Sequence, residues 1–352
     1  MLRKIAPLVV FCLALAGLAG CGSTTSHFMY AALPGSGGGQ IAAYREDPGS
    51  GLLTTISGSP FAAGQGARAV VIHPSKKFLY TANTGENTVS LFNIAANGAL
   101  TEVTPRTVTG ASPNLMLMDS TGGFLYLSNS VSNNISVFSI TASNGALTAV
   151  TGSPFQVGAT PLAMALSPSG NFLFVTSGAS QGLVSVFSVT AGVLGQVGSP
   201  VPTGGRAPYA VAMDKTGGFL YAANFLDKSL TVFTVSSTGG LTQQAGSPIA
   251  LAYTAPIALL VDPSGKYLYI ANQGSGNLAG YSIPSSGFPA LLTTSPFSAS
   301  GATVLAADPG GKFLFVGNST TVMVYSVDSA GTLTSRNSVS PGSAPASLAV
   351  SN

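Results

Sequence analysis

The chain has 352 residues, of which 44 are glycine and 22 are proline; 45% are hydrophobic and 7% are charged. The hydrophobic content argues against intrinsic disorder, because disordered chains lack the apolar surface that offsets the entropy of folding. The formal charge is only +3, and Lys and Arg form no cluster, so nucleic acid is not an expected partner.

The N-terminus has the parts of a secretory signal. Two basic residues precede an apolar run that ends in Leu-Ala-Gly-Cys21, with small residues at the expected cleavage point. This ending resembles the bacterial lipoprotein box, which implies cleavage before Cys21 and a diacylglycerol on its sulfur. We predict a signal peptide over 1–20 and a lipidated cysteine with a tether over 21–27. An uncleaved signal anchor is the alternative.

Export has consequences for the remaining domain. Loss of Arg3 and Lys4 leaves 11 basic against 10 acidic residues, close to neutrality. Cys12 leaves with the signal, so no disulfide is expected to staple the fold. No later apolar run reaches about 18 residues, which argues against a second membrane span. The expected location is the cell envelope, at the periplasmic or extracellular face of a bacterial membrane, with that membrane as partner through Cys21.

One sequence unit recurs along the rest of the chain, and its clearest copy reads DPSGKYLYIAN at 262–272. Its first residues are typical of a tight turn, and the apolar run after them is typical of a buried strand. A degraded copy lies at 28–32. The unit returns every 46–48 residues, as its aromatic-Leu-aromatic triplets show: Leu79, Leu125, Leu173, Leu220, Leu268 and Leu314.

Each period predicts four strands, which in the second unit are Ala69–Ile72, Phe78–Ala82, Thr88–Ile94 and Ala99–Val103. Four antiparallel strands in about 40–50 residues are typical of a propeller blade. The first unit lacks an inner strand, and residues 344–350 resemble the missing one. The sequence therefore predicts an all-β, seven-bladed β-propeller over 28–352, closed by the C-terminal strand joining the N-terminal blade. An outer-membrane barrel and a parallel β-solenoid fit this period less well.

Two sets of repeated polar residues are interpreted as structural. Aspartates and one histidine begin the turns before the second strands: His73, Asp119, Asp214, Asp262 and Asp308. Asparagines end the second strands, where we expect them to adopt left-handed conformations and bond their own backbone: Asn83, Asn129, Asn224, Asn272 and Asn318. A ligand-binding circle of asparagines is the alternative.

The repeated PSGKYLYIAN unit is similar to that of the seven-bladed lactonase and YVTN-repeat propellers, and the similarity covers residues 28–352. The 6-phosphogluconolactonase-like members imply sugar-lactone hydrolysis by His, Arg and Glu near the central channel. Where the resemblance implies Pro-His, this chain reads Pro113-Asn114 and Pro208-Tyr209. Phe225 stands where an acidic residue is implied. We therefore expect little or no lactonase activity.

The channel mouth is the expected ligand site, because loops before the first strands and between second and third strands share one face. The candidate binding residues on this face are Arg68, Glu86, Asn114, Arg206, Tyr209 and Asp227. The two arginines offer planar forks for a carboxylate or phosphate; bonding to loop carbonyls is their structural alternative. His27 falls in the tether and His73 on the opposite face, so neither is expected to act in acid–base catalysis. No catalytic residue, metal or cofactor is predicted.

Three functions follow. The leading one is a binding or interaction module at the cell envelope, with a small carbohydrate or a protein as ligand at the channel mouth. The second is a sugar-lactone hydrolase, with Arg68 or Arg206 as the electrophile and Glu86 or Asp227 as the base. The third is a structural envelope protein.

Overall fold

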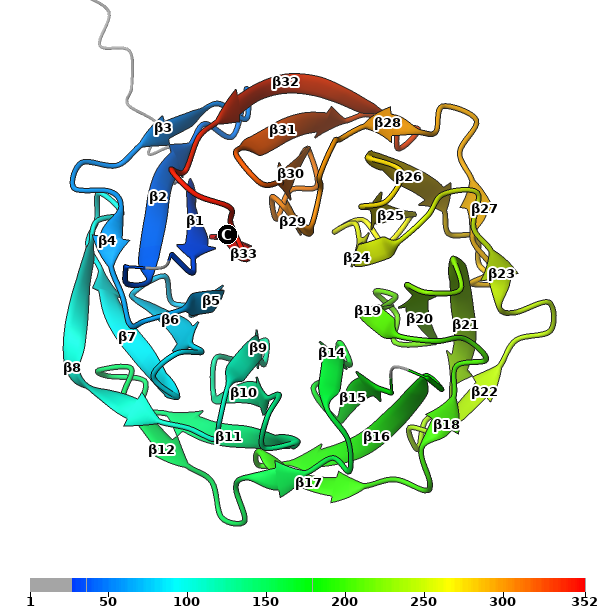
Figure 1. Cartoon of the computed structure of the whole chain (residues 1–352), viewed down its shortest axis with the longest axis horizontal. Coiled ribbons are helices and arrows are strands. Elements are labelled where there is room, and N and C mark those ends of the chain that lie inside the picture. The colour runs from blue at the N-terminus through cyan, green and yellow to red at the C-terminus, as the bar shows by residue number, and fades with distance from the viewer. Residues whose placement is uncertain (1–26, 36, 179, 352) are drawn as a thin grey trace, which may run out of the picture.

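The computed structural model describes residues 27–35, 37–178 and 180–351. Seven β-sheets form a ring around a central channel, and successive stretches of the chain build successive sheets (Figure 1). Each sheet runs from an inner strand beside the channel to an outer strand at the rim. The predicted seven-bladed propeller is thus confirmed. The predicted signal peptide, Cys21 and residues 22–26 lie outside the described residues.

The strands of each blade are given from the channel outwards. Blade 1 contains β33 (Ser347–Val350), β1 (His27–Leu33), β2 (Gln40–Glu46) and β3 (Leu53–Thr55), and blade 2 contains β5 (Ala67–Ile72), β6 (Phe78–Asn83), β7 (Thr88–Ile94) and β8 (Leu100–Val108). Blade 3 contains β9 (Pro113–Met118), β10 (Phe124–Asn129), β11 (Asn134–Ile140) and β12 (Leu147–Ala149), and blade 4 contains β14 (Pro161–Leu166), β15 (Phe172–Ser177), β16 (Leu183–Thr190) and β17 (Val193–Gln196). Blade 5 contains β19 (Pro208–Met213), β20 (Phe219–Asn224), β21 (Ser229–Val235) and β22 (Leu241–Gln243). Blade 6 contains β24 (Pro256–Val261), β25 (Tyr267–Asn272), β26 (Asn277–Ser282) and β27 (Ala290–Leu291), and blade 7 contains β29 (Val304–Ala307), β30 (Phe313–Gly317), β31 (Val322–Val327) and β32 (Leu333–Val339). Short strands also pair with the third strand of five blades: β4 (Phe61–Ala62), β13 (Phe155–Gln156), β18 (Val201–Pro202), β23 (Ile249–Ala250) and β28 (Phe297–Ser298).

Both ends of the described chain meet in blade 1 and close the ring (Figure 1). Strand β33 pairs antiparallel with β1, with Leu348 opposite Ala31. Ser351 then donates its N–H to the carbonyl of Phe28 at 2.8 Å, and its Oγ accepts the N–H of Phe28 at 2.8 Å. The predicted closure is confirmed, although the strand is shorter than the expected 344–350. Pairing removes the sheet edges that an open array would expose.

The hydrophobic core lies between adjacent blades. Tyr30 and Ile41 of blade 1, for example, pack in one cluster with Leu79 and Phe92 of blade 2. The aromatic-Leu-aromatic triplets place their large residues in these interfaces, since Leu79 is fully buried. The repeat that is visible in the sequence is therefore the repeat of the inter-blade core.

In four of these interfaces a tyrosine hydroxyl bonds to a glycine of the next blade. Tyr80 Oη donates to the carbonyl of Gly145 at 2.7 Å. Gly145 has φ +74°, and a Cβ there would lie 2.8 Å from Cγ of Phe78. Only glycine combines this backbone conformation with such a close approach. The same bond recurs in the pairs Tyr30–Gly98, Tyr221–Gly287 and Tyr269–Gly331.

The ring has two faces. The mouth face carries the starts of the inner strands and the loops between second and third strands; the turn face carries the turns between first and second strands. On the turn face, Oδ1 of Asp119 accepts the N–H of Phe124 at 2.6 Å, which confirms a structural role for this aspartate. Nε2 of His73 lies 3.0 Å from the carbonyl oxygen of Gly122, so this imidazole is part of the turn face, as expected.

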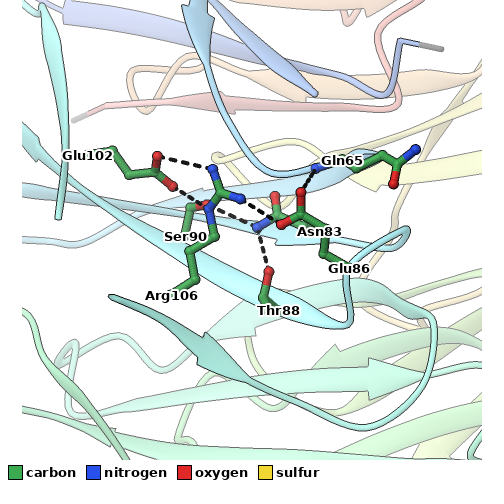
Figure 2. A network of polar contacts seen from close by, with 7 residues as sticks. All are labelled: Gln65, Asn83, Glu86, Thr88, Ser90, Glu102 and Arg106. Carbon is green, nitrogen blue, oxygen red and sulfur yellow. Dashed lines mark hydrogen bonds and ion pairs between the residues drawn. The ribbon is translucent and has the colours of Figure 1, made fainter. Parts of the chain in front are cut away.

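The asparagines that end the second strands are structural. The predicted bond to neighbouring backbone is present at Asn318, whose Oδ1 accepts the N–H groups of Thr320 and Thr321, and at Asn272, whose Nδ2 donates to the carbonyl of Ile270. For the asparagines of blades 2, 3 and 5 the predicted mechanism is wrong. Nδ2 of Asn83 donates to Oγ1 of Thr88 at 3.0 Å and to Oγ of Ser90 at 2.9 Å (Figure 2). These contacts cross to side chains of the third strand instead of the asparagine's own backbone. Positive φ occurs later in the loop, at Asn87, Asn133 and Lys228. Asn129 and Asn224 each repeat this pair of side-chain contacts.

Candidate functional site

A β-bulge at the start of the inner strand shapes the channel mouth in five blades. In blade 5, Pro208 lies opposite Asn224 and Ala210 opposite Ala223, which leaves Tyr209 without a partner. A bulge re-aims the side chain of the extra residue. The same bulge in four other blades leaves one residue of each inner strand without a partner: Arg68, Asn114, Leu162 and Ile257. We call these five residues, with Thr303 and Ala346 at the corresponding positions of blades 7 and 1, the mouth ring.

All mouth-ring residues line one cavity of about 550 Å³, to which the inner strands of all seven blades contribute. This volume lies within the range of small-molecule sites. Hydroxyl groups of Ser130 and Thr160 add to the polar lining at the mouth, and the deeper side chains are largely aliphatic. The propeller thus has a cavity of ligand size at the place where the sequence predicts a site.

Arg68 is the only charged residue among the described residues that line this cavity. Its Nε donates a hydrogen bond to Oδ1 of Asn114, its neighbour in the mouth ring. Within the described chain, no carboxylate forms an ion pair with the guanidinium. Arg68 also borders a second cavity of about 470 Å³, which includes Gln65 and Thr84. An exposed cation is thereby held at the mouth, and its terminal nitrogens have no hydrogen-bond partner among the described residues.

Arg206 has a different environment. Its Nε and Nη2 donate to Oδ1 of Asp227 at 2.8 and 2.6 Å, and its backbone N–H donates to Oδ2 at 2.7 Å. These bonds hold the pKa of Asp227 below its usual value. Neither residue lines the cavity. The Tyr209 ring, which does line it, packs 5.1 Å from the ring of Phe225.

Glu86 belongs to a network on the flank of blade 2, which Figure 2 shows. Its Oε1 accepts the backbone N–H of Gln65 at 2.9 Å. Its Oε2 lies 2.6 Å from Nη1 of Arg106, whose Nε donates to Oε1 of Glu102 at 2.7 Å. The Gln65 N–H, followed by Arg106, lowers the pKa of Glu86. This carboxylate braces a loop against strand β8 and does not line the cavity.

A buried carboxyl group lies away from the mouth, at the turn-face end of blade 1. Glu46 is 1% exposed, and neither carboxyl oxygen has a hydrogen-bond partner within the described residues. Nδ1 of His27 is 3.8 Å from its Oε2. Burial, with smaller contributions from the charges of Asp308 and Asp47, raises the pKa of Glu46 to about 7.

The described residues offer no group of three or more His, Cys, Asp or Glu side chains placed to hold a metal ion. No helix in the described part of the chain has the length and apolar character needed to cross a bilayer.

The family of the chain follows from comparison with known proteins. A family model described as "Lactonase, 7-bladed beta-propeller" matches residues 49–163, 151–254 and 251–350. The chain belongs to this family. The predicted relation to lactonase-like propellers is therefore confirmed. No curated protein sequence matches this lactonase-family chain.

Solved structures share the fold of this lactonase-family propeller. A protein from Bacteroides fragilis described as a candidate 6-phosphogluconolactonase is 18% identical with a TM-score of 0.78, over 94% of this chain and 99% of that chain. The periplasmic gluconolactonase from Pseudomonas aeruginosa is 21% identical with a TM-score of 0.75, over 93% and 99%. At these identities the likeness shows the fold alone.

The six candidate residues thus divide into two groups in this lactonase-family propeller. Arg68, Asn114 and Tyr209 come together in the mouth ring. Glu86, Arg206 and Asp227 lie outside the cavity, in ion pairs on the mouth face. The sequence analysis missed the remaining ring residues: Leu162, Ile257, Thr303 and Ala346. For three of them a signal exists, because each directly follows a proline in the same way as Asn114 and Tyr209: Leu162, Ile257 and Ala346.

Proposed function

We propose that this lactonase-family propeller is a lipid-anchored binding protein of the bacterial cell envelope, which captures a small anionic ligand at its channel mouth. The observation that carries the proposal is Arg68, a cation on a ligand-sized cavity that is held by Asn114 and has no carboxylate partner within the described chain. An open guanidinium matches carboxylate and phosphate oxygens with paired N–H donors. The anchor and the location rest on Cys21 and the signal before it.

Hydrolysis of a sugar lactone is the second candidate, and the family relation favours it. Arg68 has the charge needed to stabilise a developing oxyanion. The reaction also needs a base within hydrogen-bond reach and with a pKa near the working pH. Glu86 and Asp227 lie outside the cavity, and the pKa of each is lowered. We therefore rank binding above hydrolysis, and above a purely structural role that would leave the cavity unused.

Titration calorimetry with a panel of organic anions tests the proposal. The panel contains gluconate, 6-phosphogluconate, succinate, benzoate and octanoate. Arg68→Met should weaken every observed binding at least about tenfold, because hydrogen bonds to charged groups contribute about 1.5–3 kcal/mol. Arg206→Met is the matched control, since this arginine is paired and outside the cavity, and it should leave affinity unchanged.

Two results would contradict the ranking. If no anion binds, or if both arginine variants bind as the wild type does, Arg68 is not the anion site. The same proteins should be assayed for turnover of glucono-δ-lactone and 6-phosphogluconolactone. Saturable hydrolysis that Arg68→Met abolishes would place the hydrolase first.

A further inference from the structure

The side chains of the channel wall change character below the mouth ring. The polar lining residues lie at the starts of inner strands or in loops, whereas half-buried aliphatic side chains follow deeper along the strands: Leu115, Leu117, Leu259, Leu305 and Leu348. The hydroxyl that comes nearest to this level, Ser347 Oγ, already accepts the N–H of Val70 at 3.3 Å. The cavity therefore combines one cation at its mouth with an aliphatic wall.

We infer that the anionic ligand is an aliphatic monocarboxylate, with its carboxylate on Arg68 and its alkyl chain along the aliphatic wall. This inference rests on the proposed binding function and names the class of ligand. The observation behind this inference is one positive charge at the mouth with several leucines below it. Burial of an alkyl chain against these leucines is favourable. The leucines offer a polyhydroxylated sugar no side-chain hydrogen-bond partners, and every sugar hydroxyl that stays unpaired there costs free energy.

The geometry of the arginine specifies the head group. Nε of Arg68 is occupied by Asn114, so the two terminal nitrogens remain as the donor pair. A carboxylate presents two oxygens in one plane and matches such a pair. Leu162 and Ile257 stand in the same ring, so an alkyl chain meets apolar side chains from the level of the head group downwards.

A homologous series tests the inference: acetate, butanoate, hexanoate, octanoate and decanoate, titrated by calorimetry below micelle-forming concentrations. Affinity should rise with chain length by up to roughly fourfold per methylene, the equivalent of about 0.8 kcal/mol for a buried methylene, until the chain fills the cavity. Decanol, which has the chain without the charge, should bind much more weakly than decanoate.

Three variants separate the two ends of the ligand. Arg68→Met should reduce the affinity for decanoate to that for decanol. Leu162→Thr installs the residue type that blade 7 carries at this position, Thr303, and should weaken decanoate more than acetate. Arg206→Met should change neither. Circular dichroism and melting temperatures establish that the variants are folded.

The outcomes distinguish this inference from the proposed function. If the affinity does not change with chain length but still depends on Arg68, the ligand is not an aliphatic carboxylate, and the proposed capture of a small anion is retained. If Arg68→Met leaves the affinity for every anion unchanged, both this inference and the proposed binding function are overturned. A rising series in which decanol equals decanoate also overturns the inference, since the carboxylate then contributes nothing.

Discussion

Arg68 and Asn114 occupy the same mouth-ring position in adjacent blades, and Nε of the arginine donates to the amide oxygen of the asparagine. Free rotation of an arginine side chain represents about 2 kcal/mol of conformational entropy that ordering must overcome. The contact across the blade interface orders part of that side chain before any ligand arrives. Asn114 is therefore a positioning residue for the cation.

Two substitutions of Asn114 should have different effects on anion affinity. Asn114→Ala removes the contact, and a loss of about three- to tenfold is expected from one hydrogen bond of about 1 kcal/mol. Asn114→Asp keeps the shape but pairs Arg68 with a negative charge, so the loss should be larger. Calorimetry with the anion that binds most tightly measures both losses. In a protein that already carries Arg68→Met, Asn114→Ala should cause no further loss of anion affinity. Equal losses in the two variants would contradict this account.

The buried carboxyl of Glu46 predicts a pH dependence of stability. Its pKa in the folded protein is about 7, above the ordinary value of 4.5, so the folded state binds the proton more tightly than the unfolded state. Stability should therefore fall as pH rises from about 4.5 to 7, by about 1.4 kcal/mol per unit of pKa shift, and stay level above that. Glu46→Gln should be more stable than wild type at pH 8 and similar to it near pH 4.5.

Urea unfolding at the two pH values measures this effect. Asp47 is the control, because it is the next residue, is exposed, and has a pKa lowered by hydrogen bonds from Ser50 and Gly49. Asp47→Asn should bring no gain at pH 8. A Glu46→Gln variant that is destabilised equally at both pH values would show that the carboxyl group is not buried in its neutral form.

Gly145→Ala should destabilise the interface between blades 2 and 3. The left-handed conformation of this residue costs an alanine about 1 kcal/mol, and the new methyl group would overlap the Phe78 ring, which adds about 1–3 kcal/mol. Gly158 has a similar φ of +78°, and a Cβ added there would meet no other atom within 4 Å. Gly158→Ala should therefore show the backbone cost alone. Chemical denaturation compares the two, and equal losses would argue against the packing contribution.

Removal of residues 344–352 should lower the melting temperature and promote aggregation. The deletion takes away β33 and exposes the edge of β1, and exposed sheet edges invite pairing with other chains. Leu220→Ala is the comparison, because it removes a fully buried side chain at a typical cost of about 2–5 kcal/mol without opening an edge. Light scattering should rise only in the truncated protein; an unchanged melting curve would show that the ring closes elsewhere.

Cys21→Ser should release the protein from the membrane fraction or leave an uncleaved precursor. Each buried methylene contributes about 0.8 kcal/mol, and two acyl chains hold a protein stably on a bilayer. Fractionation and mass spectrometry of the N-terminus measure the outcome. A wild-type protein that is fully soluble and retains residues 1–20 would refute lipidation.

The fold could be predicted because its core is itself periodic. Each aromatic-Leu-aromatic triplet places its leucine in the interface on one side of its blade and an aromatic ring in the interface on the other side, as Leu79 and Tyr80 do. The spacing of Leu79, Leu125 and the later leucines therefore counts the blades. Part of the mouth could be predicted for the same reason, since Asn114 and Tyr209 follow prolines at equivalent positions. These features depend on local sequence and on repetition.

The ion pair of Glu86 with Arg106 could not be predicted, because it depends on how far strand β8 extends. Arg106 reaches Glu86 only because β8 continues to Val108, beyond the predicted end at Val103. The burial of Glu46 had a signal that was not used: the two-residue alternation of Ala42, Tyr44 and Glu46 places the carboxyl on the buried side of β2.

The start of β1 determines how an anchored protein would be oriented. His27 begins this strand at the turn face, whereas the mouth ring is on the other face. Six residues from Cys21 to His27 span at most roughly 20 Å when extended. With its lipid in the bilayer, the protein would keep the turn face close to the headgroups and direct the opening of the channel into the surrounding fluid. A fatty acid would then be collected from solution and not drawn laterally out of the membrane, so its supply would depend on release by other molecules.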